Sequence, residues 1–140
     1  MKVMKLTPED HQLVDAAREQ LLKAYDPVWH SVGAAIRTTT GTVYTGINVD
    51  TSTGGGGGAD AEMSALCAAV SAGDKTNIET IVAVGKDKVL PPCGVCRQTL
   101  ITHAPQVEVI LPEAEADKLI KVPLRELLPY AFENVRTPDL

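Results

Sequence analysis

Helix-like and strand-like segments alternate along this chain of 140 residues, and no other feature of the sequence constrains its fold as strongly. The spacing of apolar residues predicts the following elements in order: a helix from Pro8 to near Asp26, strands over 32–36 and 43–49, a helix over 60–72, a strand over 78–84, a helix from Pro91-Pro92-Cys93 to about His103, a strand over 107–111 and a short helix over 123–128. A turn at Thr40-Gly41 joins the first two strands into a hairpin. Strands that alternate with helices are typical of an α/β sandwich. We therefore expect a single domain spanning residues 1–140.

Composition and charge exclude several classes of protein. The formal net charge of −5 argues against a non-specific nucleic-acid binder, which needs a basic surface. The longest stretch without a charged residue runs from Thr38 to Val49, whereas a membrane-spanning helix needs roughly 20 apolar residues. The polar residues that follow Met1 to Lys5 predict no signal peptide. Two of the three cysteines form a Cys-x-x-Cys motif, which favours metal or redox chemistry in a reducing compartment, so we expect a cytoplasmic protein.

Several other residues favour structural roles. Apolar spacing predicts the buried face of the 60–72 helix: Met63, Leu66, Cys67 and Val70. On that face Cys67 is expected to pack in the core. His11 and His103 lie outside any metal-like spacing and are expected at the surface or in satisfied positions. The five glycines of Gly54–Gly58 predict either a flexible surface loop or a mobile flap, because no Gly-Lys-Ser or Gly-Lys-Thr follows them.

Two segments carry the residues suited to catalysis, and each opens a predicted helix after a loop: Asp60-Ala61-Glu62 and Pro91-Pro92-Cys93-Gly94-Val95-Cys96. Cys93 and Cys96 lie at a helix N-terminus, where the partial positive charge favours thiolates, and two thiolates on one turn can chelate Zn²⁺. A catalytic zinc takes a third protein ligand, for which Asp60 offers a carboxylate oxygen. Glu62 would lie beside the metal and move a proton from water to a leaving amine.

Together these motifs resemble the signature of the cytidine deaminase superfamily, in which His/Cys-Ala-Glu precedes Pro-Cys-x-x-Cys. Three more blocks are similar to the small single-domain cytidine and blasticidin-S deaminases: Val32-Gly33-Ala34-Ala35, Thr45-Gly46-Ile47-Asn48-Val49 and Arg125-Glu126-Leu127-Leu128-Pro129. The resemblance implies a three-layer αβα sandwich around a five-stranded mixed sheet and a homotetramer, or at least a dimer. It also implies a zinc cofactor held by Asp60, Cys93 and Cys96, although the family has His or Cys where this chain has Asp60.

The resemblance further implies a substrate pocket. The residues that correspond to it are Trp29, His30, Asn48, Asp50 and Ala61. Nucleoside deaminases hold the ribose hydroxyls with Asn-x-Glu, for which this chain has Asn48-Val49-Asp50 with its shorter acid. Backbone groups near Ala61 and Pro91-Pro92 would hold the edge of the base.

We therefore expect a zinc-dependent hydrolytic deaminase that releases ammonia from a small heterocyclic amine, without a nucleic-acid or membrane partner. The candidate substrates are cytidine, deoxycytidine, a nucleobase, a base analogue such as a triazine, and blasticidin S. Two alternatives of a different class stay open: a thiol–disulfide redox protein that uses Cys93 and Cys96, and a non-catalytic subunit stabilised by zinc. Arg97 is a candidate to offset the negative charge of the site. Asp60 has its own alternative role, since Asp often caps the helix that it precedes.

Overall fold

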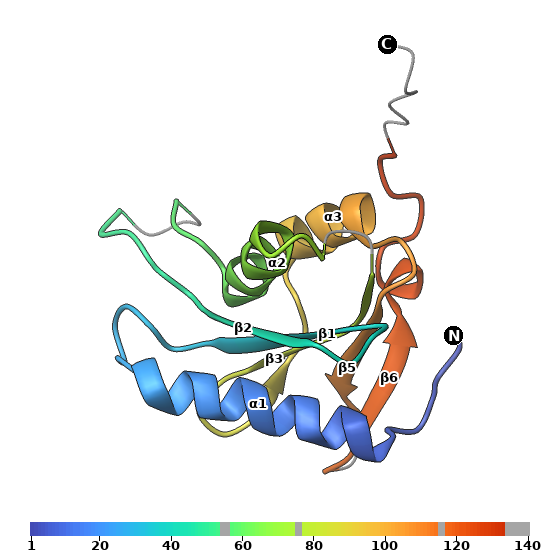
Figure 1. Ribbon diagram of the computed structural model, residues 1–140, viewed down its shortest axis with the longest axis horizontal. Coiled ribbons are helices and arrows are strands. Elements are labelled where there is room, and N and C mark those ends of the chain that lie inside the picture. The colour runs from blue at the N-terminus through green and yellow to red at the C-terminus, as the bar shows by residue number, and fades with distance from the viewer. Residues whose placement is uncertain (54–56, 75–76, 115–116, 134–140) are drawn as a thin grey trace.

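Helices cover both faces of a mixed β-sheet in the computed structural model, which describes residues 1–53, 57–74, 77–114 and 117–133 (Figure 1). Helix α1 (Pro8–Ala24) lies on one face, and helices α2 (Ala61–Ser71) and α3 (Gly94–His103) lie on the other. Each face has its own apolar core. The core under α1 includes Leu13, Val82 and Ile110, and the core under α2 and α3 includes Ile81 and Leu100. This arrangement confirms the expected three-layer αβα sandwich.

Six strands form the sheet: β1 (Gly33–Thr38), β2 (Val43–Ile47), β3 (Ile78–Val84), β4 (Val89–Leu90), β5 (Glu108–Pro112) and β6 (Leu119–Pro123). Five of them follow the order β2-β1-β3-β5-β6, and the two-residue β4 pairs beside the end of β3. Strands β3 and β5 are parallel, and the other pairs are antiparallel. The sheet is therefore mixed as expected, and β4 brings the strand count to six instead of five.

Most predicted elements lie where apolar spacing places them. Thr7 caps α1 reciprocally with Asp10, as its Thr-Pro start indicates, and the β1–β2 hairpin turns at Gly41 with a φ of 89°. The prediction for the region after residue 118 is wrong in part, because the sequence predicts no strand there and the structure has β6. The expected short helix over 123–128 is a single 3-10 turn, η1 (Leu124–Leu127).

The predicted buried face of α2 is wrong in part. Leu66 is buried, but Met63 is only half-buried, Val70 is 41% exposed and Cys67 is exposed, so Cys67 does not pack in the core. The face that meets the sheet consists of Leu66 and three alanines at every fourth position: Ala61, Ala65 and Ala69. Small side chains let α2 approach β2 so closely that a Cβ on Gly46 would lie 2.4 Å from the backbone nitrogen of Ala65. The buried face of α2 is therefore the one with small side chains, which allow its backbone to approach β2, and not the one with the largest apolar side chains.

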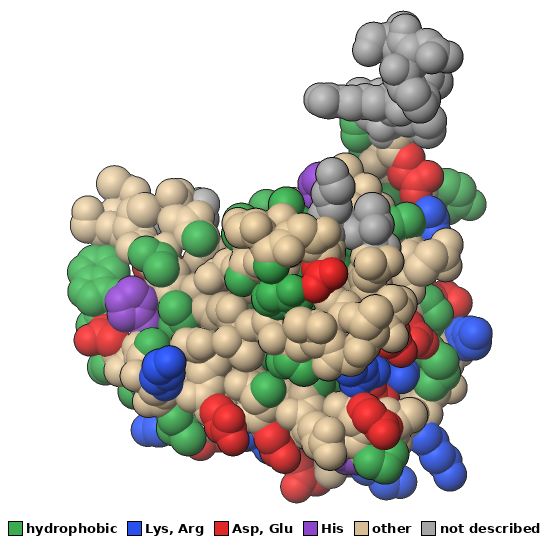
Figure 2. Space-filling model, in the orientation of Figure 1, with side chains coloured by type: hydrophobic (Ala, Val, Ile, Leu, Met, Phe, Trp, Pro, Cys, Tyr) green, Lys and Arg blue, Asp and Glu red, His purple; other side chains and the backbone are tan. Residues whose placement is uncertain are grey.

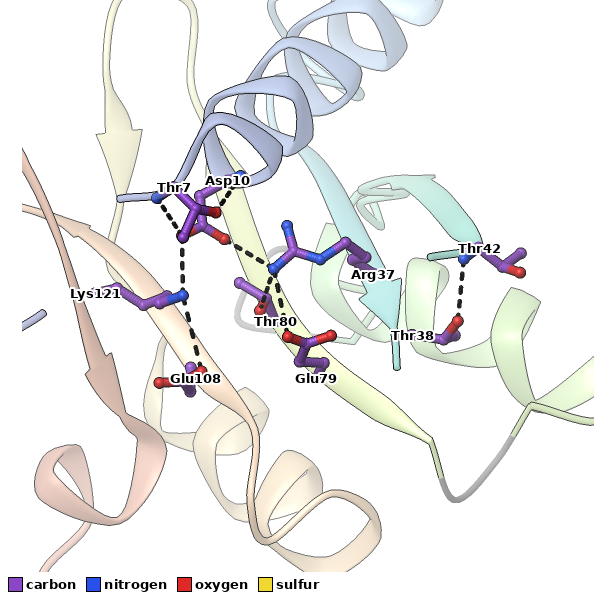
Figure 3. Close-up of polar contacts among 9 residues, drawn as sticks. All are labelled: Thr7, Asp10, Arg37, Thr38, Thr42, Glu79, Thr80, Glu108 and Lys121. Carbon is purple, nitrogen blue, oxygen red and sulfur yellow. Dashed lines mark hydrogen bonds and ion pairs between the residues drawn. The ribbon is translucent and has the colours of Figure 1, made fainter. Parts of the chain in front are cut away.

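A buried ion network ties the start of α1 to the sheet, at β1 and β6 (Figure 3). The carboxylate of Asp10 is fully buried and accepts hydrogen bonds from Arg37 Nη2 at 2.8 Å and from Lys121 Nζ at 2.9 Å. The backbone N–H of Thr7 donates to the same carboxylate at 2.9 Å, and Arg37 Nη2 also donates to Thr80 Oγ1 at 3.0 Å. One acid therefore holds two cations that come from separate strands.

No helix within the described residues is both long enough and apolar enough to cross a bilayer.

Candidate metal centre

Asp60 and Cys93 occupy equivalent positions at the starts of two helices. Asp60 is the N-cap of α2, and Cys93 is the N-cap of α3. Neither side chain makes the hydrogen bond to its own helix that an N-cap residue commonly accepts. The capping role considered for Asp60 is therefore not the one that its carboxylate has in this structure.

The carboxylate of Asp60 points instead at two thiols. Its Oδ2 atom lies 3.3 Å from Cys93 Sγ and 3.2 Å from Cys96 Sγ. One ligand atom from each of the three residues lies within 4.8 Å of the other two. Three donors that converge in this way, two soft and one hard, match the protein ligand set of a catalytic zinc site, which leaves one position for water. The three residues predicted as metal ligands are thus brought together.

Glu62 lies on the first turn of α2, two residues after Asp60, and is 6% exposed. Burial raises the pKa of the Glu62 carboxyl, and the nearby charge of Asp60 raises it further, whereas a hydrogen bond with Cys96 acts in the opposite direction. A carboxyl group with a raised pKa holds a proton more strongly than an exposed carboxyl group does. The position of Glu62 therefore suits a group that accepts and returns a proton.

The cluster is rich in acidic groups, and no ion pair joins them to a cation in the part of the chain that the structure describes. Burial raises the pKa of the Cys96 thiol, and the charges of Glu62 and hydrogen bonding to Asp60 raise it further. Among the described residues, no ion pair involves Asp60 or Glu62. A divalent cation would stabilise the thiolate and carboxylate forms of these groups together. The donor set therefore fits zinc in both geometry and charge.

A second cluster contains the side chains expected to line the substrate pocket. Asn48 is buried, and its Oδ1 atom accepts hydrogen bonds from the backbone N–H groups of Ser31 at 2.7 Å and Val32 at 2.9 Å. His30 Nδ1 lies 2.8 Å from the carbonyl oxygen of Asn48, and Asn48 Nδ2 donates to Asp50 Oδ1 at 3.2 Å. The carbonyl oxygen of Asn48's side chain is thus used to hold the segment before β1.

Backbone pairing joins this cluster to the metal centre. Val49 and Ala59 exchange two hydrogen bonds, of 2.8 and 2.9 Å, one residue after Asn48 and one residue before Asp60. Trp29 adjoins this cluster, because its carbonyl oxygen accepts a hydrogen bond from the backbone N–H of Asp50 at 3.4 Å. Its side chain is 41% exposed. Trp29, His30, Asn48 and Asp50 therefore form one cluster next to the segment that leads to Asp60, whereas the side chain of Ala61 is buried on the face of α2 that meets the sheet.

The comparisons with known proteins agree with this geometry. The family model for the cytidine and deoxycytidylate deaminase zinc-binding region matches residues 7–111. The chain belongs to the cytidine deaminase family. A blasticidin-S deaminase from Bacillus cereus is 33% identical over 141 aligned positions, which cover 94% of this chain and 98% of that protein. A cytidine deaminase from Halalkalibacterium halodurans is 33% identical over 102 positions, which cover 72% of this chain and 76% of that protein.

Solved structures of cytidine deaminases share the fold. The crystal structure of the enzyme from Burkholderia pseudomallei superposes with a TM-score of 0.75 at 36% identity, covering 91% of this chain and all of that one. The crystal structure of the enzyme from Mycobacterium tuberculosis superposes with a TM-score of 0.72 at 32% identity and covers 89% of this chain. This deaminase is therefore a zinc-dependent hydrolase that acts on the C–N bond between a ring carbon and its exocyclic amine in a small molecule.

Arg97, the candidate to offset the negative charge of the site, donates hydrogen bonds to two backbone carbonyl groups. Its Nε atom donates to the carbonyl oxygen of Pro92 at 2.8 Å, and its Nη1 atom donates to the carbonyl oxygen of Leu127 at 2.8 Å. Arg97 therefore fastens the loop before Cys93 to η1, and no ion pair within the described residues connects it to the acids of the metal centre. The sequence gives no signal for these two partners, because both are backbone carbonyl oxygens and one of them lies 30 residues away.

Two other expectations concern residues away from the centre. His11 and His103 are exposed, as expected. The glycine run Gly54–Gly58 lies partly outside the described residues, which resume at Gly57. Gly57 and Gly58 are exposed, and a Cβ on Gly58 would lie 1.8 Å from the carbonyl oxygen of Val49. The last glycine of the run is therefore required for close approach to the segment after β2, which carries Asn48 and Asp50.

Proposed function

We propose that Asp60, Cys93 and Cys96 hold the zinc ion and that Glu62 is the proton-transfer residue in deamination of a cytosine-bearing nucleoside. One observation carries the proposal: the three donor atoms lie within 4.8 Å of one another beside a carboxyl group that is 6% exposed. When bound, zinc supplies Lewis acidity that makes a water molecule easier to deprotonate near neutral pH.

Glu62 carries out the proton transfers in this proposal. Its carboxylate takes a proton from the attacking water and delivers it to the ring nitrogen next to the amine-bearing carbon. A new C–O bond forms at that carbon. Glu62 then passes the second proton of the water to the amine, the C–N bond breaks, and ammonia leaves while a ring carbonyl is formed. Water and the amine are consumed and carbonyl and ammonia are produced, so the step balances without an oxidant.

The pocket edge positions the remainder of the substrate. Asn48 holds the backbone of Ser31 and Val32, so it shapes the pocket wall and presents Asp50 beside it. Asp50 is exposed and can accept hydrogen bonds from hydroxyl groups with its second carboxylate oxygen. Trp29 and His30 offer ring surfaces at the same edge. Ala61 and Pro91-Pro92 contribute backbone groups to the base edge in this proposal.

Blasticidin S is the second candidate substrate, and one comparison favours it. The deaminase named for that substrate in Bacillus cereus aligns with 94% of this chain and with 98% of its own length. Asp50 is shorter than the glutamate that nucleoside deaminases use. A pocket with a shorter acid leaves room for a substituent larger than a ribose ring.

An ammonia-release screen at equal substrate concentrations tests both candidates. The substrates are cytidine, deoxycytidine, cytosine, blasticidin S, guanine and a triazine base, and zinc per chain is measured on the same sample. Turnover of a cytosine nucleoside above the other substrates supports the proposal, and turnover of blasticidin S alone supports the second candidate. Zinc without turnover of any substrate indicates a non-catalytic subunit. A metal-free protein with a thiol–disulfide equilibrium indicates the redox alternative.

We further propose that the deaminase acts in the cytoplasm as a homotetramer, or at least as a dimer. Large apolar side chains are exposed near the site and at the end of the described chain: Trp29 41%, Val95 69%, Tyr130 105% and Phe132 75%. Burial against a second copy would remove this apolar surface from water. Light scattering combined with size exclusion tests the proposal, and a fully active monomer would contradict it.

A further inference from the structure

A cavity of about 620 Å³ lies on the α1 side of the sheet, away from the metal centre. The metal centre is formed at the starts of α2 and α3, which cover the opposite face (Figure 1). Residues of α1, of the β3–β4 turn and of the β5–β6 connection line this cavity. Its volume lies within the range of roughly 300–1,000 Å³ that is usual for small-molecule sites. Neither the ligands of the metal centre nor the pocket edge reach it.

The polar lining of the cavity is mainly basic. Four lysine or arginine side chains converge there from four segments of the chain: Lys5, Arg18, Lys88 and Lys118. Two carboxylates, from Asp87 and Asp117, also line it, and His11 adds an imidazole. Among the described residues, no ion pair involves any of these four basic side chains. Figure 2 shows acidic and basic side chains scattered over the visible face of the molecule.

This excess of positive charge stands out in a chain whose formal net charge is −5. Like charges held together in a concave site repel one another, and that repulsion is relieved when an anion binds among them. Four cations from separate segments surround a ligand better than cations on one helix face do. The charge of the cavity therefore favours a ligand with several negative charges.

The remaining lining is apolar. Val89 is 3% exposed and belongs to the core under α1, and Leu119 packs against that core. Both side chains line the cavity together with Pro112. An apolar floor beneath a basic rim fits a molecule that joins a ring to charged groups, because the ring is removed from water while the charges stay at the rim.

From the charge and the apolar lining of this cavity, we infer that the deaminase has a second site, which binds an oligophosphate attached to an apolar or aromatic ring. The oligophosphate contacts the basic rim, and the ring rests on Val89 and Leu119. The inference does not depend on the identity of the deaminated substrate, because the two sites lie on opposite faces of the sheet.

Isothermal titration calorimetry of the intact protein at constant ionic strength tests this inference, with ATP and pyrophosphate as the probes. We expect saturable binding of ATP at one site per chain and weaker binding of pyrophosphate. Arg18→Glu should weaken the binding of ATP by about tenfold or more, since it replaces a charge-assisted contact by a repulsive one. Lys88→Glu, on a different element, should do the same, and it decides the question if Arg18→Glu fails to fold.

The matched control is Lys23→Glu, which makes the same charge change on an exposed residue of α1 outside the cavity lining. We expect it to change the affinity for ATP by less than about twofold, the effect of a distant surface charge. Glu62→Gln should leave the binding of ATP unchanged. Three results would overturn the inference: no saturable binding of ATP, a loss of ATP affinity in Lys23→Glu as large as in Arg18→Glu, or a loss of ATP affinity in Glu62→Gln. Equal affinities for pyrophosphate and ATP would contradict the claim that Val89 and Leu119 bind the ring of the ligand.

Discussion

Replacing Asp10 by asparagine should destabilise the folded deaminase and change how its stability depends on pH. Burial alone would raise the pKa of the Asp10 carboxyl, but hydrogen bonds from Thr7, Lys121 and Arg37 outweigh burial and lower it from 3.8 to about 2. Each pKa unit between the folded and unfolded states corresponds to about 1.4 kcal/mol, so the ionised carboxylate contributes about 2 kcal/mol. A lowered pKa stabilises the folded state above pH 3.8, and this stabilisation is lost as the pH falls through about 2.

The loss in Asp10→Asn should exceed that figure at neutral pH. Arg37 and Lys121 have side chains that are only 11% and 8% exposed, so the variant leaves two buried cations without the acid between them. Removal of one partner from a buried ion pair costs about 3–5 kcal/mol. We therefore expect the free energy of unfolding to fall by that amount at pH 7, and by about 1 kcal/mol less at pH 3, where unfolded Asp10 is already protonated.

Urea denaturation followed by circular dichroism at pH 7 and pH 3 measures both effects. Asp15→Asn is the matched control, because Asp15 lies on the same helix and is exposed. It should change the free energy of unfolding by no more than about 0.5 kcal/mol. The reasoning is refuted if Asp10→Asn costs no more than Asp15→Asn, or if the difference between the two variants is the same at both pH values.

Two further predictions concern α2, the helix that carries the proposed proton-transfer residue Glu62. Glu62→Gln keeps the shape of the side chain but cannot transfer protons, so turnover measured by ammonia release should fall at least about a hundredfold with zinc content unchanged, whereas the exposed Glu19→Gln should keep full activity. Gly46→Ala places a Cβ 2.4 Å from the backbone of α2, and it should lower the free energy of unfolding by about 1–3 kcal/mol and lower activity, because α2 carries Glu62, the proposed proton-transfer residue. Gly94→Ala, where an added Cβ meets nothing within 4 Å, is its control in thermal unfolding, and equal melting temperatures for both variants would contradict the prediction.

The sequence predicted the elements whose signal is local. The hairpin of β1 and β2, the cap at Thr7 and the starts of α2 and α3 all follow from turn residues, capping residues and apolar runs near each position. These signals depend only on neighbours in the chain. Asp60 and Cys93 stand out as candidate metal ligands for the same reason, since each immediately precedes a helix, and Cys96 follows on the first turn of α3.

Features that depend on distant partners could not be predicted. Lys121 is a charged residue within the apolar sequence of β6, so this segment does not look like a buried strand from its sequence. Its side chain can be buried because its ammonium group pairs with Asp10, which lies 111 residues earlier in the chain. The buried face of α2 was misjudged because alanines, rather than the larger Met63, Cys67 and Val70, approach the sheet at Gly46. Apolar spacing reports which residues share a face, and it does not report how close the opposing backbone lies.

The central claim is that Asp60 is the third protein ligand of the zinc ion, and zinc per chain in Asp60→Ala tests it most directly. With two thiols left, the site has too few protein ligands to retain a catalytic zinc, so we expect about one zinc per chain in the wild type and well below half of that in Asp60→Ala. Asp60→Cys, which supplies a thiol at the same position, should restore the metal. Near-full zinc occupancy in Asp60→Ala, measured beside its melting temperature, would contradict the account.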